Sequence, residues 1–400
     1  MAFQVVFQVY ELFSFFFYFF FLVMGLSSGG GGGGEGGSST VEIDSLNCNF
    51  PAIFNFGDSN SDTGGISAAF TAVPPPNGET FFGKPSGRFC DGRLIIDFIA
   101  EELGLPYLSP YLDSLGASCG FEHGANFATG GSSVRKGGYS PFHLDVQISQ
   151  FLQFKARIND LYSTQQPHQQ QEDQGQPFLP KPDDFSKALY TLDIGQNDLS
   201  YGFQYTTEIE TRASIPQILD QFSTAVHQLY KEGARAFWVH NTGPIGCLPY
   251  SVIYYPKKSG NLDQNGCVKP RNEIAQEFNS QLKSRLIQFR SQLPNTTFTY
   301  VDVYSVKYNL ISSAKSQGYV DPLEFCCGSY YGAHFDCGEK EIVNGTVYGG
   351  ACDNPTAHIS WDGIHYTEAA NQWVAKYILN GSMSDPQVPI AQACHNTVNP

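Results

Sequence analysis

The sequence predicts an α/β fold in which helices cover both faces of a mostly parallel β-sheet. Short buried strands alternate with long amphipathic helices along the chain, and parallel strands need connections of this length. The composition agrees, because 41% hydrophobic and 14% aromatic residues can form a sizeable core in a chain of 400 residues. No internal repeat and no long linker calls for a second domain.

Four apolar runs predict the buried strands. The first, residues 52–56, ends at Gly57, and the second covers residues 189–194. Residues 236–240 and 297–301 are rich in aromatic and β-branched side chains and predict two further strands. Ligands bind at the carboxyl ends of parallel strands, so the residues that follow these runs are candidates for a functional site.

Helical spacing of apolar side chains predicts the connecting segments. The segments with this spacing are 94–103, 146–162, 215–229, 274–286 and 367–379. Gly104 and Gly233 follow two of them and are typical helix ends. The last helix carries Ala370, Trp373, Val374 and Ile378 on its apolar face.

The N-terminus predicts export. An apolar run of about fifteen residues, 12–26, has the length of a signal-peptide core, although a signal anchor is the alternative because Glu11 borders the run and no basic segment precedes it. We expect a signal peptide at 1–28, a flexible Gly/Ser-rich segment at 29–47 and a single domain at 48–400. A Gln-rich stretch at 165–176 is expected to form a low-complexity insertion.

Cysteines and acceptor sequences agree with a secreted protein of the extracellular space or cell wall. Ten cysteines suit an oxidising compartment. Asn295, Asn344 and Asn380 each begin an N-glycosylation acceptor pattern.

The charge excludes some partners. Acidic residues outnumber basic ones by 38 to 23, which gives a formal net charge of −15. Nucleic acid and anionic membranes would be repelled, and no stable membrane insertion is expected once the signal peptide is removed. The oligomeric state is not readable from the sequence.

Ser59, Asp362 and His365 have the chemistry of a serine hydrolase. A serine hydroxyl needs a base to accept its proton, and histidine titrates near the working pH. Asp362 precedes His365 by three residues, close enough in a turn to orient the imidazole.

The oxyanion formed during ester cleavage needs hydrogen-bond donors that are already in place. Asn197 offers a side-chain N–H, and Ser59 and Gly131 offer backbone N–H groups. Gly130 is the alternative to Gly131, which we prefer from its spacing to Asn126.

Four segments resemble the motif blocks of the GDSL, or SGNH-hydrolase, esterase/lipase family, and they occur in the family's order. They are Phe56-Gly57-Asp58-Ser59-Asn60-Ser61-Asp62-Thr63-Gly64, Asn126-Phe127-Ala128-Thr129-Gly130-Gly131, Gly195-Gln196-Asn197-Asp198 and Asp362-Gly363-Ile364-His365. The resemblance implies a three-layer αβα flavodoxin-like fold, a Ser59–His365–Asp362 triad, an oxyanion hole of Ser59, Gly131 and Asn197, and no cofactor.

Two further segments, 87–93 and 241–249, resemble the plant branch of this family, and residues 91–162 look most like early-nodulin-type esterases and their acetylesterase relatives. This implies hydrolysis of acetyl or other short acyl esters of glycosides, cell-wall sugars or secondary metabolites. A long-chain lipase is one alternative. A catalytically inactive secreted binding or defence protein is another.

A second serine must be weighed. Ser118 lies in a G-x-S-x-G pattern, the nucleophile elbow of another hydrolase fold. That motif needs a buried strand before it and a helix after it, and neither is predicted here. A loop with a disulfide at Cys119 is the simpler interpretation.

The cysteine and histidine spacings do not indicate a metal site. Residues 334–337 form a His-Phe-Asp-Cys cluster, but in an exported chain Cys337 is expected in a disulfide. Cys326 and Cys327 are neighbours and are expected to pair with different partners. A bridge from Cys247 to Cys267 would close a loop.

Overall fold

The computed structural model describes residues 47–113, 120–164, 178–255, 260–330 and 334–395, which belong to one compact unit, Leu46–Pro400. Several predictions lie outside the described residues. These are the signal peptide, residues 29–46 of the Gly/Ser-rich segment, the insertion at 165–176, and the loop with Ser118 and Cys119.

A six-stranded sheet forms the centre of the unit, in the order β2-β1-β3-β4-β5-β8. Its parallel strands are β1 (Ile53–Gly57), β2 (Gly124–Asn126), β3 (Leu189–Asp193), β4 (Ala236–His240) and β5 (Thr297–Val301). The short strand β8 (Ser384–Asp385) pairs antiparallel with β5 at one edge. The predicted α/β fold with a mostly parallel sheet is confirmed.

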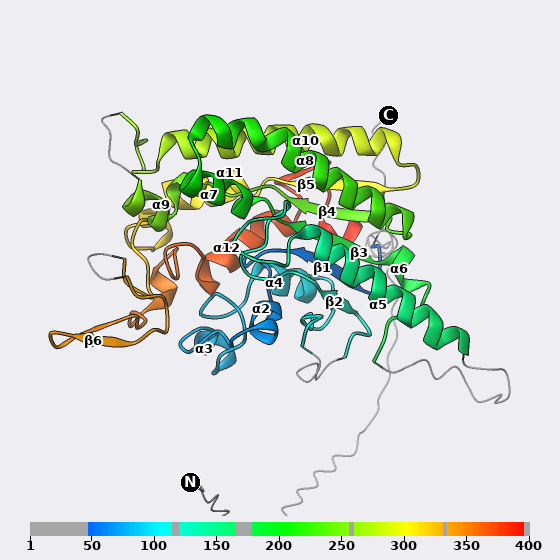
Figure 1. The fold of residues 1–400 in the computed structure, drawn as a ribbon, viewed down its shortest axis with the longest axis horizontal. Coiled ribbons are helices and arrows are strands. Elements are labelled where there is room, and N and C mark those ends of the chain that lie inside the picture. Colours follow the sequence, from blue (N-terminus) through cyan, green and yellow to red (C-terminus); the bar gives the residue numbers. More distant parts are fainter. Residues whose placement is uncertain (1–46, 114–119, 165–177, 256–259, 331–333, 396–400) are drawn as a thin grey trace, which may run out of the picture. The chain divides into compact units, whose positions relative to one another are not determined.

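Two sets of helices cover the sheet. In one set α8 (Glu208–Lys231) packs against both α5 (Leu144–Thr164) and α10 (Lys269–Gln292). In the other, α12 (Glu368–Leu379) packs against α4 (Ile95–Glu102) and α11 (Val303–Ser312). Figure 1 shows α8 and α10 at the top of the view, and α4 and α12 lower, near the level of β1.

Burial on both faces explains the strand sequences. Every residue of β1, β4 and β5 is buried, so their sequences are apolar runs rather than alternating patterns. Aromatic rings fill the space between β1 and its neighbours. Phe54 stacks on Phe185 with 5.0 Å between ring centroids, and Phe56 stacks on Phe127 at 5.3 Å.

The observed elements follow the predicted ones closely. The strands predicted at 236–240 and 297–301 have the observed bounds, and β1 is displaced by one residue. The long helices extend beyond the predicted apolar segments. Helix α8 begins earlier because Thr207 and Glu210 form a capping box, in which Thr207 Oγ1 accepts a 3.2 Å hydrogen bond from Glu210 N–H.

Shorter elements complete the unit. The helices are α2 (Gly65–Ala69), α3 (Glu79–Phe82), α6 (Asp184–Lys187), α7 (Gln196–Tyr205) and α9 (Pro249–Tyr254), and the 3₁₀ turns are Ile245–Cys247, Ala314–Gln317, Pro355–Ala357 and Ile390–Gln392. A hairpin of β6 (Glu341–Val343) and β7 (Thr346–Tyr348) extends away from the sheet (Figure 1). In the part of the chain that the structure describes, no helix is both long and apolar enough to cross a membrane.

Four disulfides join described residues. Cys247 pairs with Cys267, Cys326 with Cys352, and Cys327 with Cys337, which confirms the predicted bridge, the separate partners of the neighbouring cysteines and the disulfide at Cys337. The fourth bridge joins Cys48 to Cys394, across 346 positions of sequence. Cys90 is buried and carries a free thiol.

Replacing Cys48 and Cys394 together by serine is expected to lower the free energy of unfolding by about 2–5 kcal/mol, because the open chain gains conformational entropy when it unfolds. Guanidinium unfolding under non-reducing conditions measures the effect. A Cys90→Ala variant is the control that removes a sulfur without breaking a bridge. An unchanged midpoint in the double variant would show that this bridge does not stabilise the fold.

Candidate active site

The three predicted triad residues meet at the carboxyl edge of the sheet. Ser59 lies in the turn after β1, and Asp362 and His365 lie in the turn before α12. His365 Nε2 is 2.7 Å from Ser59 Oγ, and His365 Nδ1 is 2.6 Å from Asp362 Oδ2. All three residues are buried. The Ser59 hydroxyl can therefore donate to Nε2 while Nδ1–H donates to the carboxylate.

Asp362 is held as a carboxylate. Burial alone would raise its pKa, but the charge of His365 and the hydrogen bonds that Asp362 accepts lower the pKa below its ordinary value. Besides the imidazole, it accepts bonds from the backbone N–H groups of Ile364 at 2.9 Å and His365 at 2.7 Å. These contacts aim one oxygen at Nδ1 and fix the ring for proton transfer.

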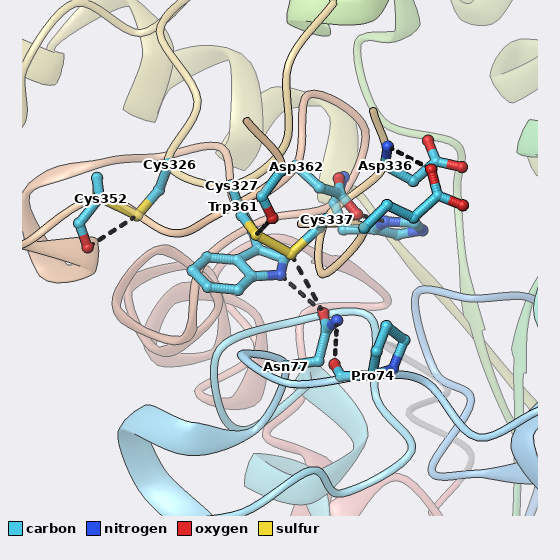
Figure 2. The surroundings of a disulfide bond; sticks show 12 residues. Pro74, Asn77, Cys326, Cys327, Asp336, Cys337, Cys352, Trp361 and Asp362 are labelled. Carbon is cyan, nitrogen blue, oxygen red and sulfur yellow. Dashed lines mark hydrogen bonds and ion pairs between the residues drawn. A yellow bond between two sulfur atoms is a disulfide. The ribbon is translucent and has the colours of Figure 1, made fainter. Parts of the chain in front are cut away.

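The segment that contains the disulfide-bonded residues Cys326 and Cys327 supports the turn at Asp362. Cys326 and Cys327 donate backbone hydrogen bonds to the carbonyl of Trp361, at 2.9 and 2.6 Å. Figure 2 shows the Trp361 indole beside the Cys327–Cys337 bridge, with its Nε1–H donating to Asn77 Oδ1 at 2.8 Å. The residue before Asp362 is thus held on both its backbone and its side chain.

The turn that carries Ser59 is held by a residue that the sequence analysis did not select. Gln147, on the buried face of α5, accepts from Gly57 N–H at 3.0 Å and donates to the Gly57 carbonyl at 2.8 Å. The sequence offers one observation that could have pointed to Gln147, namely that it is a polar residue at a core position of a helix. On the other side of the site, the Phe89 ring stacks on the His365 imidazole with 5.2 Å between centroids.

The two glycines considered for the oxyanion hole differ in their hydrogen bonds. Gly130 N–H donates to Asp62 Oδ2 at 2.7 Å and is already used. No described residue accepts the Gly131 N–H, and Gly131 lines the same cavity as Ser59 and His365. Its φ of +74° suits glycine. The geometry favours Gly131 as the donor.

Asn197 also lines this cavity, from the first turn of α7. One of its amide hydrogens is bound by the Ser132 carbonyl, with Nδ2 and oxygen 2.9 Å apart. That bond orients the amide and leaves its second N–H to donate to a substrate oxygen. The structure therefore places Ser59, Gly131 and Asn197 in the wall of one cavity.

Asp62 joins two of the motif blocks, a role that the sequence analysis did not assign. Its carboxylate accepts from the N–H groups of Gly64 at 2.8 Å and Ile66 at 3.1 Å, in addition to Gly130. Asn126 adds a second link by donating to the Ser61 carbonyl at 2.6 Å. The spacing between the nucleophile turn and the glycine turn is thereby fixed.

The cavity has a volume of about 560 Å³, far larger than an acetyl group requires. Its walls mix aromatic rings with amide, hydroxyl and guanidinium groups. They include Phe89, Tyr139, Gln196, Ser200, Phe203, Gln204, Tyr250, Tyr254, Arg271 and Tyr330.

Buried charges lie beneath the site. His240 Nδ1 is 3.3 Å from Asp193 Oδ2, and this hydrogen bond lowers the pKa of Asp193 although burial opposes it. Burial and the charge of Asp193 raise the pKa of Asp58 to about 7, and Asp58 Oδ2 has no hydrogen-bond partner among the described residues. Burial also lowers the pKa of Lys307, although the charges of Asp193 and Asp58 oppose this.

The raised pKa of Asp58 predicts a pH-dependent stability. Between the ordinary carboxyl pKa near 4 and about 7, the folded state binds a proton that the unfolded chain releases, so the free energy of unfolding falls as pH rises through this window. We expect Asp58→Asn to reduce this fall by on the order of 2–4 kcal/mol. Urea unfolding at pH 4.5 and pH 8 measures the fall in the free energy of unfolding for each protein. Asp353→Asn, at an exposed carboxylate, is the control, and equal pH dependence in all three proteins would contradict the prediction.

The structure also describes the predicted glycosylation acceptors and the His-Phe-Asp-Cys cluster. Asn295, Asn344 and Asn380 are exposed, and Asn344 lies in the β6–β7 turn. His334 Nε2 contacts Asp336 Oδ1 at 3.1 Å, while Cys337 is bonded to Cys327 instead of joining them. Among the described residues, the His, Cys and acidic clusters close enough to bind a metal all contain sulfurs of a disulfide.

A serine that faces a carboxylate-held histidine at the edge of a parallel sheet defines the class of serine hydrolases. The model of the family described as GDSL-like Lipase/Acylhydrolase matches residues 53–378. The chain belongs to this family and is a carboxylic-ester hydrolase, which confirms the family and the class of enzyme predicted from the motifs.

Three relatives of the chain come from plants. GDSL esterase/lipase At3g27950 from Arabidopsis thaliana is 55% identical over 356 residues, which are 88% of this chain and 93% of the relative. An esterase from Hevea brasiliensis is 49% identical, covering 88% and 91% of the two chains. GDSL esterase/lipase ENOD8 from Medicago truncatula is 45% identical, covering 87% and 91%. The predicted resemblance to the plant branch and its early-nodulin-type members is confirmed.

Proposed function

We propose that this protein is a secreted serine esterase that hydrolyses short acyl esters through an acyl-enzyme, with Ser59 as nucleophile, His365 as base and Asp362 as orienter. One observation carries the proposal. Ser59 Oγ, the two imidazole nitrogens and the Asp362 carboxylate form a continuous hydrogen-bonded chain, with links of 2.7 and 2.6 Å.

The acylation step follows from this geometry. Ser59 Oγ attacks the ester carbonyl carbon as His365 Nε2 takes its proton, and the Asp362 carboxylate stabilises the imidazolium that forms. The carbonyl oxygen becomes an oxyanion and accepts hydrogen bonds from Ser59 N–H, Gly131 N–H and Asn197 Nδ2–H. The imidazolium then protonates the leaving alcohol as the carbon–oxygen bond breaks.

Deacylation uses the same groups again, with water in place of the serine hydroxyl. His365 Nε2 takes a proton from a water molecule, whose oxygen attacks the acyl carbon, and the same donors hold the second oxyanion. Collapse of this intermediate releases the carboxylic acid and returns the proton to Ser59 Oγ. These residues supply the nucleophile, base and oxyanion donors themselves, so the proposed cycle includes no cofactor.

A fluorophosphonate probe tests the nucleophile, because it reacts with an activated serine hydroxyl. Labelling followed by peptide mapping is expected to place the adduct on Ser59. No labelling would support the inactive binding or defence protein instead. An adduct on Ser118 would overturn the assigned site.

Removing one oxyanion donor is expected to slow the chemical step. Asn197→Ala should lower kcat by about 10²–10³-fold with little change in KM, since the lost hydrogen bond acts mainly in the transition state. Steady-state kinetics on p-nitrophenyl butyrate measures it, and circular dichroism checks the fold. Gln372→Ala, at an exposed position of α12, is the control. An unchanged kcat would remove Asn197 from the mechanism.

The preference for short acyl chains rests on the cavity walls. Gln196, Ser200 and Gln204 place polar groups among the aromatic rings, whereas a long alkyl chain needs a continuous apolar surface. Turnover of p-nitrophenyl esters from acetate to palmitate tests this. Faster hydrolysis of palmitate than of acetate would favour the long-chain lipase.

Secretion is supported by the apolar leader, the four disulfides and three exposed acceptor asparagines. Expression of the full chain in plant cells is expected to yield protein in the apoplast that loses mass on deglycosylation. Retention in the membrane fraction would support the signal anchor.

A further inference from the structure

Arg271 is the single Lys or Arg residue among the described residues that line the active-site cavity. It is the third residue of α10, and its side chain is partly buried. A cation in the first turn of a helix is disfavoured by the helix dipole, and burial of a charge is costly without a partner. The position of this guanidinium in the cavity wall therefore needs a reason other than stability.

The charge of Arg271 is not matched by a carboxylate. Among the described residues, no acidic side chain lies within 4 Å of its guanidinium, although most other arginines have such a partner. Burial lowers the pKa of Arg271, and the charge of Glu208 opposes this only in part. The Glu208 carboxylate instead accepts a hydrogen bond from Tyr255 Oη at 3.0 Å. The acidic residue that lines the cavity, Asp336, pairs with His334.

The hydrogen-bond donors of Arg271 are also largely unused. A guanidinium has five N–H groups, and within the described residues only one bond is formed, a long contact of 3.4 Å from Nη1 to the Ser251 carbonyl. Aromatic rings hold the group in place. Its central carbon lies 5.2 Å from the ring centroid of Phe203 and 5.1 Å from that of Tyr255. These contacts position the guanidinium without consuming its N–H groups.

We infer that Arg271 binds a carboxylate group of the substrate, so that the preferred esters are anionic. A carboxylate accepts two parallel hydrogen bonds from a guanidinium, and the mixed cavity has room for an acid or alcohol part that carries one. The inference rests on the proposed function, because the same cavity holds Ser59 and His365. The carboxylate can lie on either side of the ester bond, and the two cases are separable by experiment.

Matched pairs of esters test the inference. On the alcohol side, 4-acetoxybenzoate is compared with 4-acetoxybenzamide, which has the same shape and no charge. On the acyl side, the phenyl monoesters of adipic and pimelic acid are compared with their primary amides. The measured quantity is the ratio of kcat/KM for the anionic member to that for the neutral member. A change in overall activity cancels in this ratio.

Wild-type protein is expected to prefer the anionic member of at least one pair by about 10- to 100-fold, the effect of charge-assisted hydrogen bonds. In Arg271→Gln the ratio should fall to about one. Arg271→Lys, which keeps the charge without the planar pair of donors, should give an intermediate ratio. Arg157→Gln, at an exposed position of α5, is the matched control and should keep the wild-type ratio.

A binding measurement separates this inference from the catalytic proposal. Calorimetric titration of Ser59→Ala with the uncleaved esters is expected to show tighter binding of the anionic member, and this preference should vanish when Arg271→Gln is added. Hydrolysis of both members of every pair at equal rates, or the same ratio in Arg271→Gln as in wild type, would overturn the role of Arg271 and leave the esterase proposal intact. Binding selectivity without turnover by the wild type would instead contradict the catalytic proposal alone.

Discussion

Replacing Ser59 by alanine is expected to lower kcat by about 10⁶-fold, the largest effect among the variants considered. Without Oγ no acyl-enzyme can form, and His365 would have to activate water from a position set for a hydroxyl 2.7 Å away. KM should change little, because the cavity walls remain. Release of p-nitrophenol from p-nitrophenyl butyrate, followed over hours, measures the residual rate.

Ser118→Ala is the matched control for this variant, since it removes the serine of the competing G-x-S-x-G pattern. Its kcat is expected to equal that of the wild type. The converse result, with activity lost in Ser118→Ala and kept in Ser59→Ala, would contradict the site in full.

Asp362→Asn is expected to lower kcat by about 10⁴-fold while the fold persists. The amide keeps an oxygen that can accept from the Ile364 and His365 N–H groups, so the turn can keep its shape. Its NH₂ group, however, would face Nδ1 and favour the tautomer with the proton on Nε2. That imidazole cannot accept the Ser59 proton.

The loss in Asp362→Asn should be in kcat, with thermal unfolding close to that of the wild type. Asp353→Asn is the control for an Asp-to-Asn change at an exposed position. A reduction of less than tenfold would show that Asp362 does not set the tautomer of the base. A large drop in melting temperature would instead assign Asp362 a structural role.

Much of the site was predictable because its residues follow strands or precede a helix in short, distinctive segments. Ser59 follows an apolar run that predicts a buried strand, and His365 lies just before the helical pattern of α12. The carboxyl-edge rule for parallel sheets then placed these residues near each other although they are far apart in sequence.

The supporting contacts were not predictable in the same way. Strand β2 has only three residues, Gly124–Asn126, too few to show a hydrophobic period. Asp62 and Gln147 bind backbone groups of distant turns, and such contacts exist only once the chain is folded. Arg271 likewise belongs to the amphipathic pattern of α10 in the sequence, and only the three-dimensional structure places it in the cavity.

The Cys48–Cys394 bridge gives the enzyme the topology of a closed ring. A protease that cuts one peptide bond anywhere between these cysteines converts the ring into an open chain but releases no fragment. The two halves of the active site, Ser59 near one end of the ring sequence and His365 near the other, would stay covalently tethered through the shorter path across the bridge. If the proposed secretion exposes this enzyme to proteases, a single cut is therefore a far smaller threat to it than to a chain without this bridge.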